Sequence, residues 1–534
     1  MRHLLLATAA LLVAAPAAAQ SVDPATGGAL VAEGTDHSEV MTTAEYLADV
    51  IGPRMTNSPA MRTAEQWTQD KFRGWGLVDV HKEGFDFGRG WWIEKSSVRM
   101  VAPRPVQLTA IPIAWTPATN GVVTAPVIVA PMKSAGDFAQ WKGKLAGKVV
   151  LVSAPGTGSE PNEPDFQRLS DADLAKLDVY QEPTWDPANQ RQTLARAGFE
   201  RALAQFLAEE GAVAYVTRSR NDGKLVHGEG YLHHVGETPK VPGVEMAAED
   251  YRRLVRLAWT GKAPTLEIEN NVHFDDSDPK AYNIIADIKG SDPRAGYVMA
   301  GAHLDSWVAG DGAADNGAGS AMVMEAARII AASGIKPKRT IRFALWAGEE
   351  QSLYGSIAYI EQHLAKRPAW DHVPSADEFY YSWATRFPIT PLPGHKDLAA
   401  YFNIDNGSGK IRGIYAENNM AVVPIFRDWL APFASMGAST VAIQKTEGTD
   451  HQFMQSVGIP AFQFIQDPLD YESRVHHTQL DTYDHLKAAD MRQASIILAA
   501  FLLDAANARD PLPRLPIPTA PAVTDPFTGP AKEK

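Results

Sequence analysis

Residues 296–334 read GYVMAGAHLDSWVAGDGAADNGAGSAMVMEAARIIAASG. The run opens on an apolar, β-rich stretch (296–305) and closes on a segment with helical spacing of its apolar residues (316–334). The loop between them is rich in glycine and aspartate, and the residues around it include His303 and Asp315. The stretch therefore predicts a strand, a polar loop at its carboxyl end, and a helix.

The same order recurs along the chain. Further apolar, β-rich runs are found at 281–290, 339–348, 398–405 and 460–467. Segments with helical periodicity lie between them, at 351–367 and 421–437. Strands that alternate with helices in this way predict an α/β fold with a mostly parallel central sheet flanked by helices.

Residues of the types that bind metal follow these predicted strands. They are His303, Asp315, Glu350, Asp405 and His477, with Glu349 directly before the third. Alone, such a histidine is more often structural, and such an aspartate more often caps a helix. Open α/β sheets bind ligands beyond the carboxyl ends of their strands, so the set together favours one shared site. These side chains can hold two zinc ions with one carboxylate shared, which is typical of a hydrolase that activates water between two metals.

The two adjacent glutamates have separate expected uses. Glu349 has to stay off the metal if it is to move a proton, while Glu350 is a ligand. Neighbouring side chains point to opposite faces of a straight strand, so we expect a bend over residues 348–350, where the strand ends.

Composition limits the classes of protein. The 534 residues are too many for one ordinary core, so two or three domains are expected. The formal net charge is −13 and no basic block stands out, so nucleic acid is not an expected partner. There are no cysteines, which excludes disulfides and thiolate ligands.

Both ends of the chain have a distinctive composition. Residues 1–19 are predicted to be a secretory signal peptide, with Arg2, a short apolar stretch and an Ala-x-Ala end. The mature protein is then expected to begin near Gln20 or Ser21 and to be exported, to the periplasm or the medium. No other apolar run is long enough to span a membrane. The Pro-rich segment 510–534 is expected to be an extended, poorly ordered strap.

The residues before 281, where strands and helices begin to alternate, show a different pattern. Residues 37–75 are expected to be helical and 77–130 strand-rich. Residues 120–262 mix short strands with two helical segments and resemble the protease-associated domain, a small β-rich module that is inserted in several exopeptidases. No catalytic constellation is visible inside this module, which favours a lid or spacer.

The whole set of motifs resembles the di-zinc exopeptidase family of bacterial secreted aminopeptidases, glutamate carboxypeptidase and plasma glutamate carboxypeptidase. The matching strings are H-L-D at 303–305, D-N-G-A-G at 315–319, E-E-x-x-L-x-G-S at 349–356, N-I-D at 403–405, G-T-D-H at 448–451, G-I-P at 458–460 and H-H-T-x-x-D-T at 476–482. The resemblance covers roughly 37–115 and 265–508, which it identifies as a discontinuous peptidase domain of the phosphorylase/hydrolase-like type.

The resemblance implies a role for each residue of the set. Asp315 would bridge two zinc ions, with His303 and Asp405 on one of them and Glu350 and His477 on the other. Glu349 would be the general base, and Asp305 would orient the His303 ring. The family typically has a cis peptide after the bridging aspartate, here between Asp315 and Asn316.

One position departs from the family pattern. Several relatives have a tyrosine before the last histidine ligand, where it polarises the scissile carbonyl, and this chain has His476. A histidine can donate the same hydrogen bond to the oxyanion, or it can be a packing residue. Asp450 and His451 are also expected at the pocket rim, unless they cap the helix that follows.

The expected substrates are short peptides. An aminopeptidase or dipeptidase is favoured, with a carboxypeptidase of the plasma glutamate carboxypeptidase type as the alternative. A carboxypeptidase needs a cation for the free carboxylate, and Arg386, Arg412 and Arg474 lie in loops that could reach the site. Two other classes stay open: a one-zinc glutaminyl cyclase-like transferase, and a non-catalytic, receptor-like relative. The chain could be a monomer or a homodimer.

Overall fold

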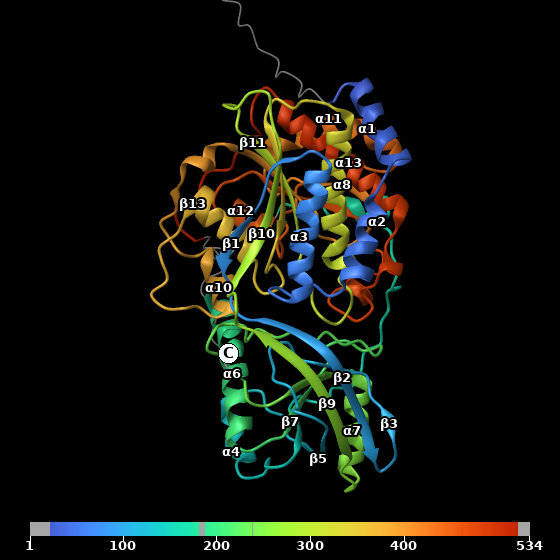
Figure 1. Cartoon of the computed structure of the whole chain (residues 1–534), viewed down its shortest axis with the longest axis vertical. Helices are drawn as coiled ribbons and strands as arrows, with labels where there is room; N and C mark the ends of the chain where they lie inside the picture. The colour runs from blue at the N-terminus through green and yellow to red at the C-terminus, as the bar shows by residue number, and fades with distance from the viewer. Residues whose placement is uncertain (1–21, 181–186, 238, 522–534) are drawn as a thin grey trace, which may run out of the picture.

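The computed structural model describes residues 22–180, 187–237 and 239–521. Two lobes are visible in Figure 1, each built on a sheet of eight strands. The expected signal peptide, residues 1–19, lies outside the described residues. Among the described helices, none is long and apolar enough to cross a membrane.

The sheet of the upper lobe runs in the order β1-β10-β12-β11-β15-β18-β16-β17. Its strands are β1 (Val78–Asp86), β10 (Lys280–Ile288), β11 (Tyr297–His303), β12 (Thr340–Trp346), β15 (Leu398–Asn403), β16 (Ile411–Tyr415), β17 (Thr440–Ala442) and β18 (Ala461–Gln466). The four central strands β12, β11, β15 and β18 are parallel, and antiparallel pairs join them to both edges of the sheet. The predicted α/β fold with a mostly parallel central sheet is confirmed.

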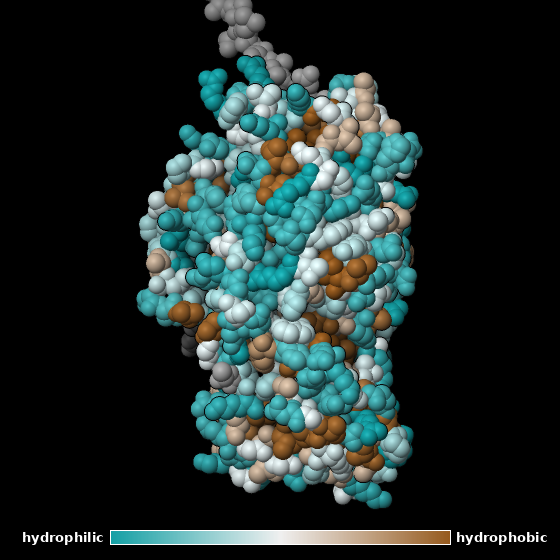
Figure 2. Space-filling model, viewed as in Figure 1, coloured by the Kyte–Doolittle hydropathy of each residue, from teal (hydrophilic) through white to brown (hydrophobic). Residues whose placement is uncertain are grey.

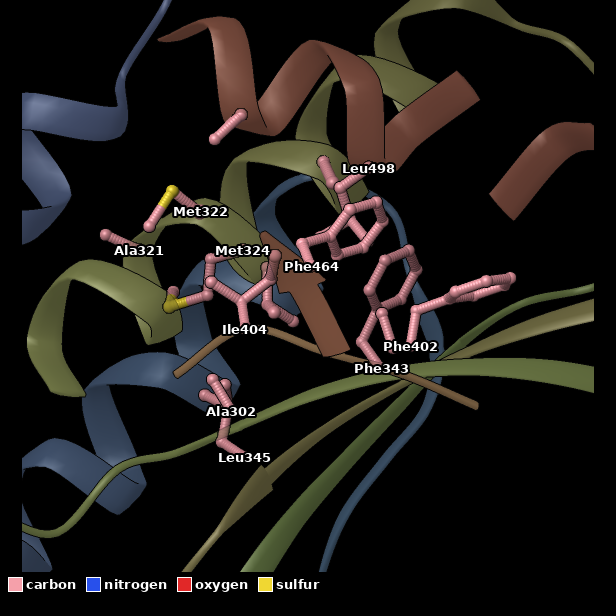
Figure 3. Packing of buried hydrophobic residues seen from close by; sticks show 14 of the residues in the cluster. Ala302, Ala321, Met322, Met324, Phe343, Leu345, Phe402, Ile404, Phe464 and Leu498 are labelled. Carbon is pink, nitrogen blue, oxygen red and sulfur yellow. The ribbon is translucent and has the colours of Figure 1, made fainter. Parts of the chain in front are cut away.

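Helices cover both faces of this sheet. They are α1 (Pro24–Asp36), α2 (Val40–Glu45), α3 (Pro59–Gly74), α8 (Ala318–Ser333), α9 (Tyr354–Tyr359), α10 (Ala376–Trp383), α11 (Val423–Leu430), α12 (His451–Gln455) and α13 (Ala488–Asn507). Helices α8, α13 and α3 pack on one face, and α9 and α12 on the other. On β11, Val298 and Ala300 point into the first core while Met299 points into the second, as strand alternation requires. Figure 3 shows the first core, where Phe343, Phe402 and Phe464 meet residues of α8 and α13.

Among the N-terminal helices, α3 agrees with the prediction, whereas the residues before it form different helices from the one expected. The Ser58 side chain accepts the amide of Met61 and caps α3, whose start follows this capping signal. The expected helix before it is divided into α2 and a π-helical turn (Tyr46–Ile51). Helix α1 was not predicted, because its Gly- and Ala-rich sequence has almost no amphipathic pattern.

The sheet of the lower lobe runs in the order β3-β2-β9-β5-β6-β7-β8-β4. Its strands are β2 (Gly90–Ala102), β3 (Val106–Gln107), β4 (Ala110–Pro112), β5 (Val123–Val129), β6 (Val149–Leu151), β7 (Ala214–Arg218), β8 (Gly243–Met246) and β9 (Thr265–Asp275). Helices α4 (Phe138–Trp141), α6 (Pro187–Glu209) and α7 (Ala248–Trp259) belong to this lobe, as Figure 1 shows, and α5 (Asp171–Lys176) lies in the same stretch of sequence. The long strands β2 and β9 lead out of the upper lobe, so this sheet takes in residues on both sides of 120–262.

The remaining features lie at the surface. Strands β13 (Ala365–Lys366) and β14 (Thr390–Pro391) form a small separate sheet. Residues 510–521 contain no helix or strand and run over the upper lobe, where Leu512 is buried. The face shown in Figure 2 is mainly hydrophilic, with small hydrophobic patches on both lobes.

Asp504 gives the stability of the upper lobe a pH dependence. It lies on α13 and is 2 % exposed, and this burial raises the pKa of its carboxyl to about 8 from 3.8. Between these two values the folded protein keeps a proton that the unfolded chain has released, so stability falls as the pH rises. We expect Asp504→Asn to be more stable than the original chain at pH 9, by at least about 1 kcal/mol, and to show little difference near pH 4.

Thermal unfolding of both proteins between pH 4 and pH 9 measures this difference. Asp428→Asn, an exposed position on α11, is the matched control and should follow the original chain at every pH. An Asp504→Asn curve parallel to the original would contradict the expectation.

Candidate active site

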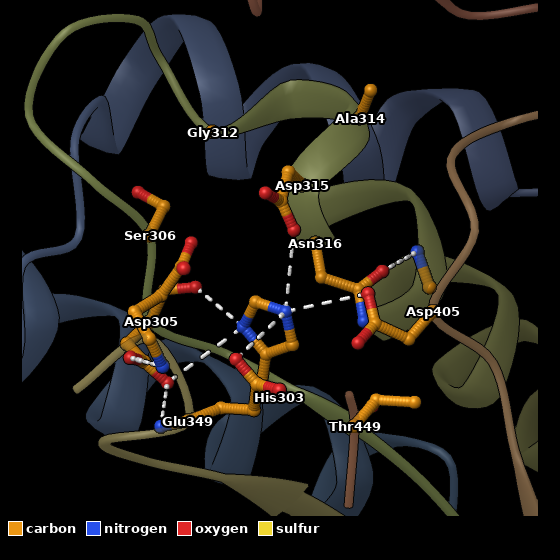
Figure 4. Close-up of polar contacts among 12 residues, drawn as sticks. His303, Asp305, Ser306, Gly312, Ala314, Asp315, Asn316, Glu349, Asp405 and Thr449 are labelled. Atoms are coloured by element: carbon orange, nitrogen blue, oxygen red, sulfur yellow. Dashed lines mark hydrogen bonds and ion pairs between the residues drawn. The ribbon is translucent and has the colours of Figure 1, made fainter. Parts of the chain in front are cut away.

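The carboxyl ends of three central strands bring the predicted residues together. His303 is the last residue of β11, Glu349 and Glu350 follow the end of β12, and Asp405 follows the end of β15. In Figure 4 the His303 ring lies between Asp315, Asp405 and Glu349. The parallel strands determine this placement, because their carboxyl ends share one edge of the sheet.

Asp315 lies in a tight turn before α8 that other segments hold in place. The amides of Ala314 and Asp315 donate to the two carboxylate oxygens of Asp481, at 2.6 and 3.1 Å. The Asn316 side chain donates to the Ile404 carbonyl and accepts the Gly319 amide, which ties the turn to the end of β15. A Cβ at Gly319 would lie 2.1 Å from Asn316 Oδ1, so glycine is required there. The peptide between Asp315 and Asn316 is cis, as expected.

The first group of facing atoms surrounds His303. Its Nε2 lies 3.3 Å from Asp315 Oδ1 and 3.4 Å from Asp405 Oδ1. Glu349 Oε2 is farther away, at 4.0 Å. One nitrogen and two carboxylate oxygens thus converge, with the glutamate just outside them.

The second group surrounds His477. Its Nε2 lies 3.0 Å from Glu350 Oε2 and 3.2 Å from Asp315 Oδ2. His476 lies beside it, with Nε2 3.7 Å from the same Asp315 oxygen and ring centroids 3.9 Å apart. Asp315 therefore presents one oxygen to each group.

Both groups open into one cavity of about 400 Å³. Its wall is lined by Tyr231, His303, Asp315, Glu349, Glu350, Ser352, Leu353, Asp377, Tyr380, Tyr381, Asp405, Asn406, Glu447, Gly448, Thr449, Tyr471, Glu472, His476 and His477. The predicted bend after β12 is confirmed, because residues 347–350 are no longer strand and Gly348 has φ 70°. This bend allows both adjacent glutamates to line the cavity.

Burial and mutual repulsion perturb the acids of the site. Burial, with the Asp405 charge added, raises the pKa of Glu349 well above its usual range. Burial and the charge of Asp315 raise the pKa of Glu350 to about 7. Burial acts against ionisation of Asp315 too, but contacts with both histidines hold the pKa of that carboxyl well below its usual range. The protein alone thus concentrates negative charge that a cation would stabilise.

The donor set fits metal ions. His303, Asp315 and Asp405 offer ligand atoms within 4.8 Å of one another, and so do Asp315, His476 and His477. Asp315 Oδ2 and Glu350 Oε1 are buried without a hydrogen-bond partner, in a cavity whose described lining contains no lysine or arginine. Buried charges are paired or coordinate metals, so these oxygens are ready for a cation.

Asp305 is fully buried. It was expected to orient the His303 ring, but its carboxylate makes its hydrogen bonds elsewhere. Its carboxylate accepts the amides of Glu349 and Glu350, at 3.2 and 3.3 Å. His303 Nδ1 lies 2.9 Å from the Asp305 backbone carbonyl and 3.7 Å from its carboxylate. Asp305 thus orients the ring through its main chain and shapes the glutamate bend through its side chain.

Arg54 fixes the loop that follows β11. Its fully buried guanidinium donates to the carbonyls of Leu304, Asp311 and Gly312, at 2.7–3.0 Å. Burial lowers the pKa of this side chain to about 10. The arginine closes the loop between His303 and Asp315, and the sequence contained no local signal for it.

Two residues expected at the rim lie behind the cavity instead. Asp450 and His451 are fully buried, and neither lines the cavity. His451 Nε2 lies 2.9 Å from Thr446 Oγ1 and 3.4 Å from Glu417. The rim prediction was wrong, because Glu447, Gly448 and Thr449 take that place and α12 begins directly afterwards.

None of the three arginines considered for a substrate carboxylate lines the cavity. Arg412 contacts Asp467 at 3.0 Å, Arg474 lies 3.6 Å from Asp165, and Arg386 stacks over the ring of Trp370.

Two tyrosines that the sequence analysis did not single out also line the cavity. Tyr471 reaches it from the turn before His476, and Tyr231 comes from the lower lobe.

Comparison with known proteins shows which family the metal-site half of the chain resembles. Residues 283–502 match the model of peptidase family M28. This part of the chain resembles the M28 peptidases. The match begins within β10 and ends within α13, and it includes every residue that we assigned to the metal site or to its chemistry. The expected class, a metal-dependent exopeptidase, is confirmed.

Known peptidases are similar to this chain over different lengths. Carboxypeptidase Q of Bos taurus is 26 % identical over 475 residues, which are 88 % of this chain and 85 % of that protein. Leupeptin-inactivating enzyme 1 of Streptomyces exfoliatus is 31 % identical over 190 residues, 35 % of this chain and 36 % of that one. Both comparisons are similarities and assign no substrate.

Solved structures share the fold of this chain. A peptidase M28 precursor from Shewanella amazonensis superposes with a TM-score of 0.65 at 22 % identity, covering 92 % of this chain and 98 % of that one. A zinc aminopeptidase from Bacillus subtilis gives a TM-score of 0.54 at 18 % identity, covering 88 % and 95 %. At these identities the likeness shows a shared fold and nothing more.

Proposed function

We propose that this protein is a peptidase of the M28 type, namely an exported, zinc-dependent aminopeptidase or dipeptidase that acts on short peptides. The observation that carries the proposal is the charge of the cavity. Besides the acids of the two groups, Asp377, Glu447 and Glu472 line it, and its described wall contains no lysine or arginine. Such a wall attracts the free α-amine of a peptide and repels a free carboxylate.

The metal site is the second part of the proposal. His303 and Asp405 would hold one zinc ion, Glu350 and His477 a second, and Asp315 both. When bound, zinc polarises carbonyl groups and lowers the pKa of water from 15.7 to about 7. The similarity to a zinc aminopeptidase supports the choice of metal.

The chain's own residues move the protons and position the substrate. Glu349, just outside the His303 group, would take one proton from the attacking water and deliver it to the leaving amine. His476, which faces the cavity and is 35 % exposed, would donate a hydrogen bond to the oxygen of the scissile carbonyl. Asp305 would hold the bend that keeps Glu349 in place.

The lower lobe and the export signal complete the proposal. We propose that residues 120–262 are a protease-associated domain that borders the substrate cleft, since Tyr231 of this segment lines the cavity. The signal-like residues 1–19 support export.

A carboxypeptidase is the alternative, favoured by the full-length similarity to Carboxypeptidase Q. Blocking one end of a dipeptide at a time separates the two. We expect N-acetylation of a good dipeptide substrate to lower kcat/KM by about 100-fold or more, because it removes the charge that the acidic wall attracts. Amidation of the carboxyl end should change kcat/KM by less than about tenfold.

The opposite pattern would assign the enzyme to the carboxypeptidases. Absence of cleavage for every free and blocked peptide in the zinc-loaded protein would remove the hydrolytic proposal itself. A cyclase-like transferase would instead cyclise peptides that begin with glutamine, and a receptor-like relative would bind them unchanged.

A further inference from the structure

A loop of the lower lobe reaches the wall of the metal site. It connects β7 to β8 and carries Glu229, whose Oε1 lies 2.7 Å from Nδ1 of His477. The other carboxylate oxygen lies 2.7 Å from Arg220 of the same loop. The side chains of His477 and Glu229 are 20 % and 17 % exposed, so the contact between these two residues is largely shielded from water.

The loop that presents Glu229 is anchored within its own lobe. The amides of His227 and Gly228 donate to the two oxygens of Glu245 on β8, at 3.1 and 2.9 Å. The ring of His227 also lies 2.8 Å from Glu245. Glu229 is therefore held at the end of a braced segment.

A second set of contacts fixes this loop to the upper lobe beside the metal site. Gln479, two residues after His477, accepts the amide of Val226 at 2.8 Å and donates to the carbonyl of Lys224 at 2.9 Å. The backbone N–H of Gln479 also donates to the backbone carbonyl of Val226, at 3.3 Å. The contact between Glu229 and His477 is thus part of a docked junction between the lobes.

His477 needs such support more than the other predicted ligands do. His303 ends a central strand, whereas His477 lies beyond β18 in an irregular loop and has φ 61°, in the left-handed region. A histidine that binds metal through Nε2 is oriented by the hydrogen bond of its Nδ1. For His303 this partner is the carbonyl of Asp305, and for His477 it is the side chain of Glu229.

We infer that the lower lobe supplies Glu229 as a positioning residue for His477, so that the second metal site is complete only when this lobe is docked. The inference rests on the proposed metal site. The lobe then serves as more than a spacer, because it orients an imidazole that binds metal.

Zinc titration of the metal-free full-length protein, with a coloured chelator as competitor, tests this inference. We expect Glu229→Ala to weaken one of the two zinc sites by about 10–100-fold and to leave the other within about threefold. Glu229→Gln keeps an acceptor oxygen and is expected to lose less than Glu229→Ala. Glu237→Gln is the matched control, since this glutamate of the same lobe pairs with Arg201 and makes no contact with His477.

Thermal unfolding of the metal-free variants separates positioning from folding. Equal melting temperatures with a weakened zinc site support the inference. Wild-type affinity at both sites in Glu229→Ala would overturn it, as would an equal loss in Glu237→Gln. If the original chain itself binds no zinc, the proposed function fails instead, so the two failures are distinct.

Discussion

Replacing Asp315 with Asn is expected to remove both zinc ions and to lower kcat/KM for a dipeptide by at least about 10⁴-fold. The physical reason is the position of this carboxylate, which presents Oδ1 to the His303 group and Oδ2 to the His477 group. An amide of the same shape has no charge to share between two cations. Metal analysis after gel filtration, together with dipeptide hydrolysis, measures both effects.

Asp311→Asn is the matched control for this experiment. Asp311 lies in the same loop but does not line the cavity, and the variant should keep its zinc and most of its activity. The metal count of the original chain is informative as well. Two ions per chain agree with the proposed hydrolase, whereas a single tightly bound zinc would favour the cyclase-like alternative. Retention of both ions by Asp315→Asn would rule out the bridging role.

Replacing Glu349 with Gln is expected to lower kcat by about 10²–10⁴-fold while both zinc ions remain bound. The carboxylate lies 4.0 Å from His303 Nε2, farther than either aspartate of that group, so it is placed to move a proton rather than to bind metal. Glutamine keeps the size of the side chain but cannot take up the proton. Steady-state kinetics and metal analysis of the same sample test the two parts of this expectation.

The neighbouring variant Glu350→Gln is the comparison that makes this test specific. Glu350 Oε2 lies 3.0 Å from His477 Nε2, so its loss should reduce zinc content as well as activity. Full activity of Glu349→Gln would exclude this residue as the base. Loss of zinc from Glu349→Gln would make it a ligand instead.

Much of the fold follows from local sequence patterns. The alternation of apolar runs and helical segments in 281–467 predicts the parallel centre of the upper sheet, because each run is long enough to bury a strand on both faces. Helix α1 could not be predicted, because its own sequence has little amphipathic pattern. It packs against α8 and α13, and these distant helices stabilise it. Paired residues of strands β2 and β9 are 163 or more positions apart in the chain, a distance that no local pattern can bridge.

Local sequence patterns were enough to predict which residues follow the central strands. His303, Glu349, Glu350 and Asp405 could be expected to meet because parallel strands end at one edge of a sheet. The residues that surround them come from distant parts of the chain and could not be predicted in this way. Glu229 reaches His477 across 248 positions of the chain, and Asp450 is buried outside the cavity lining although its neighbour Thr449 belongs to it. Strand ends are set by local periodicity, whereas contacts between lobes and the direction of a loop side chain depend on packing between distant segments.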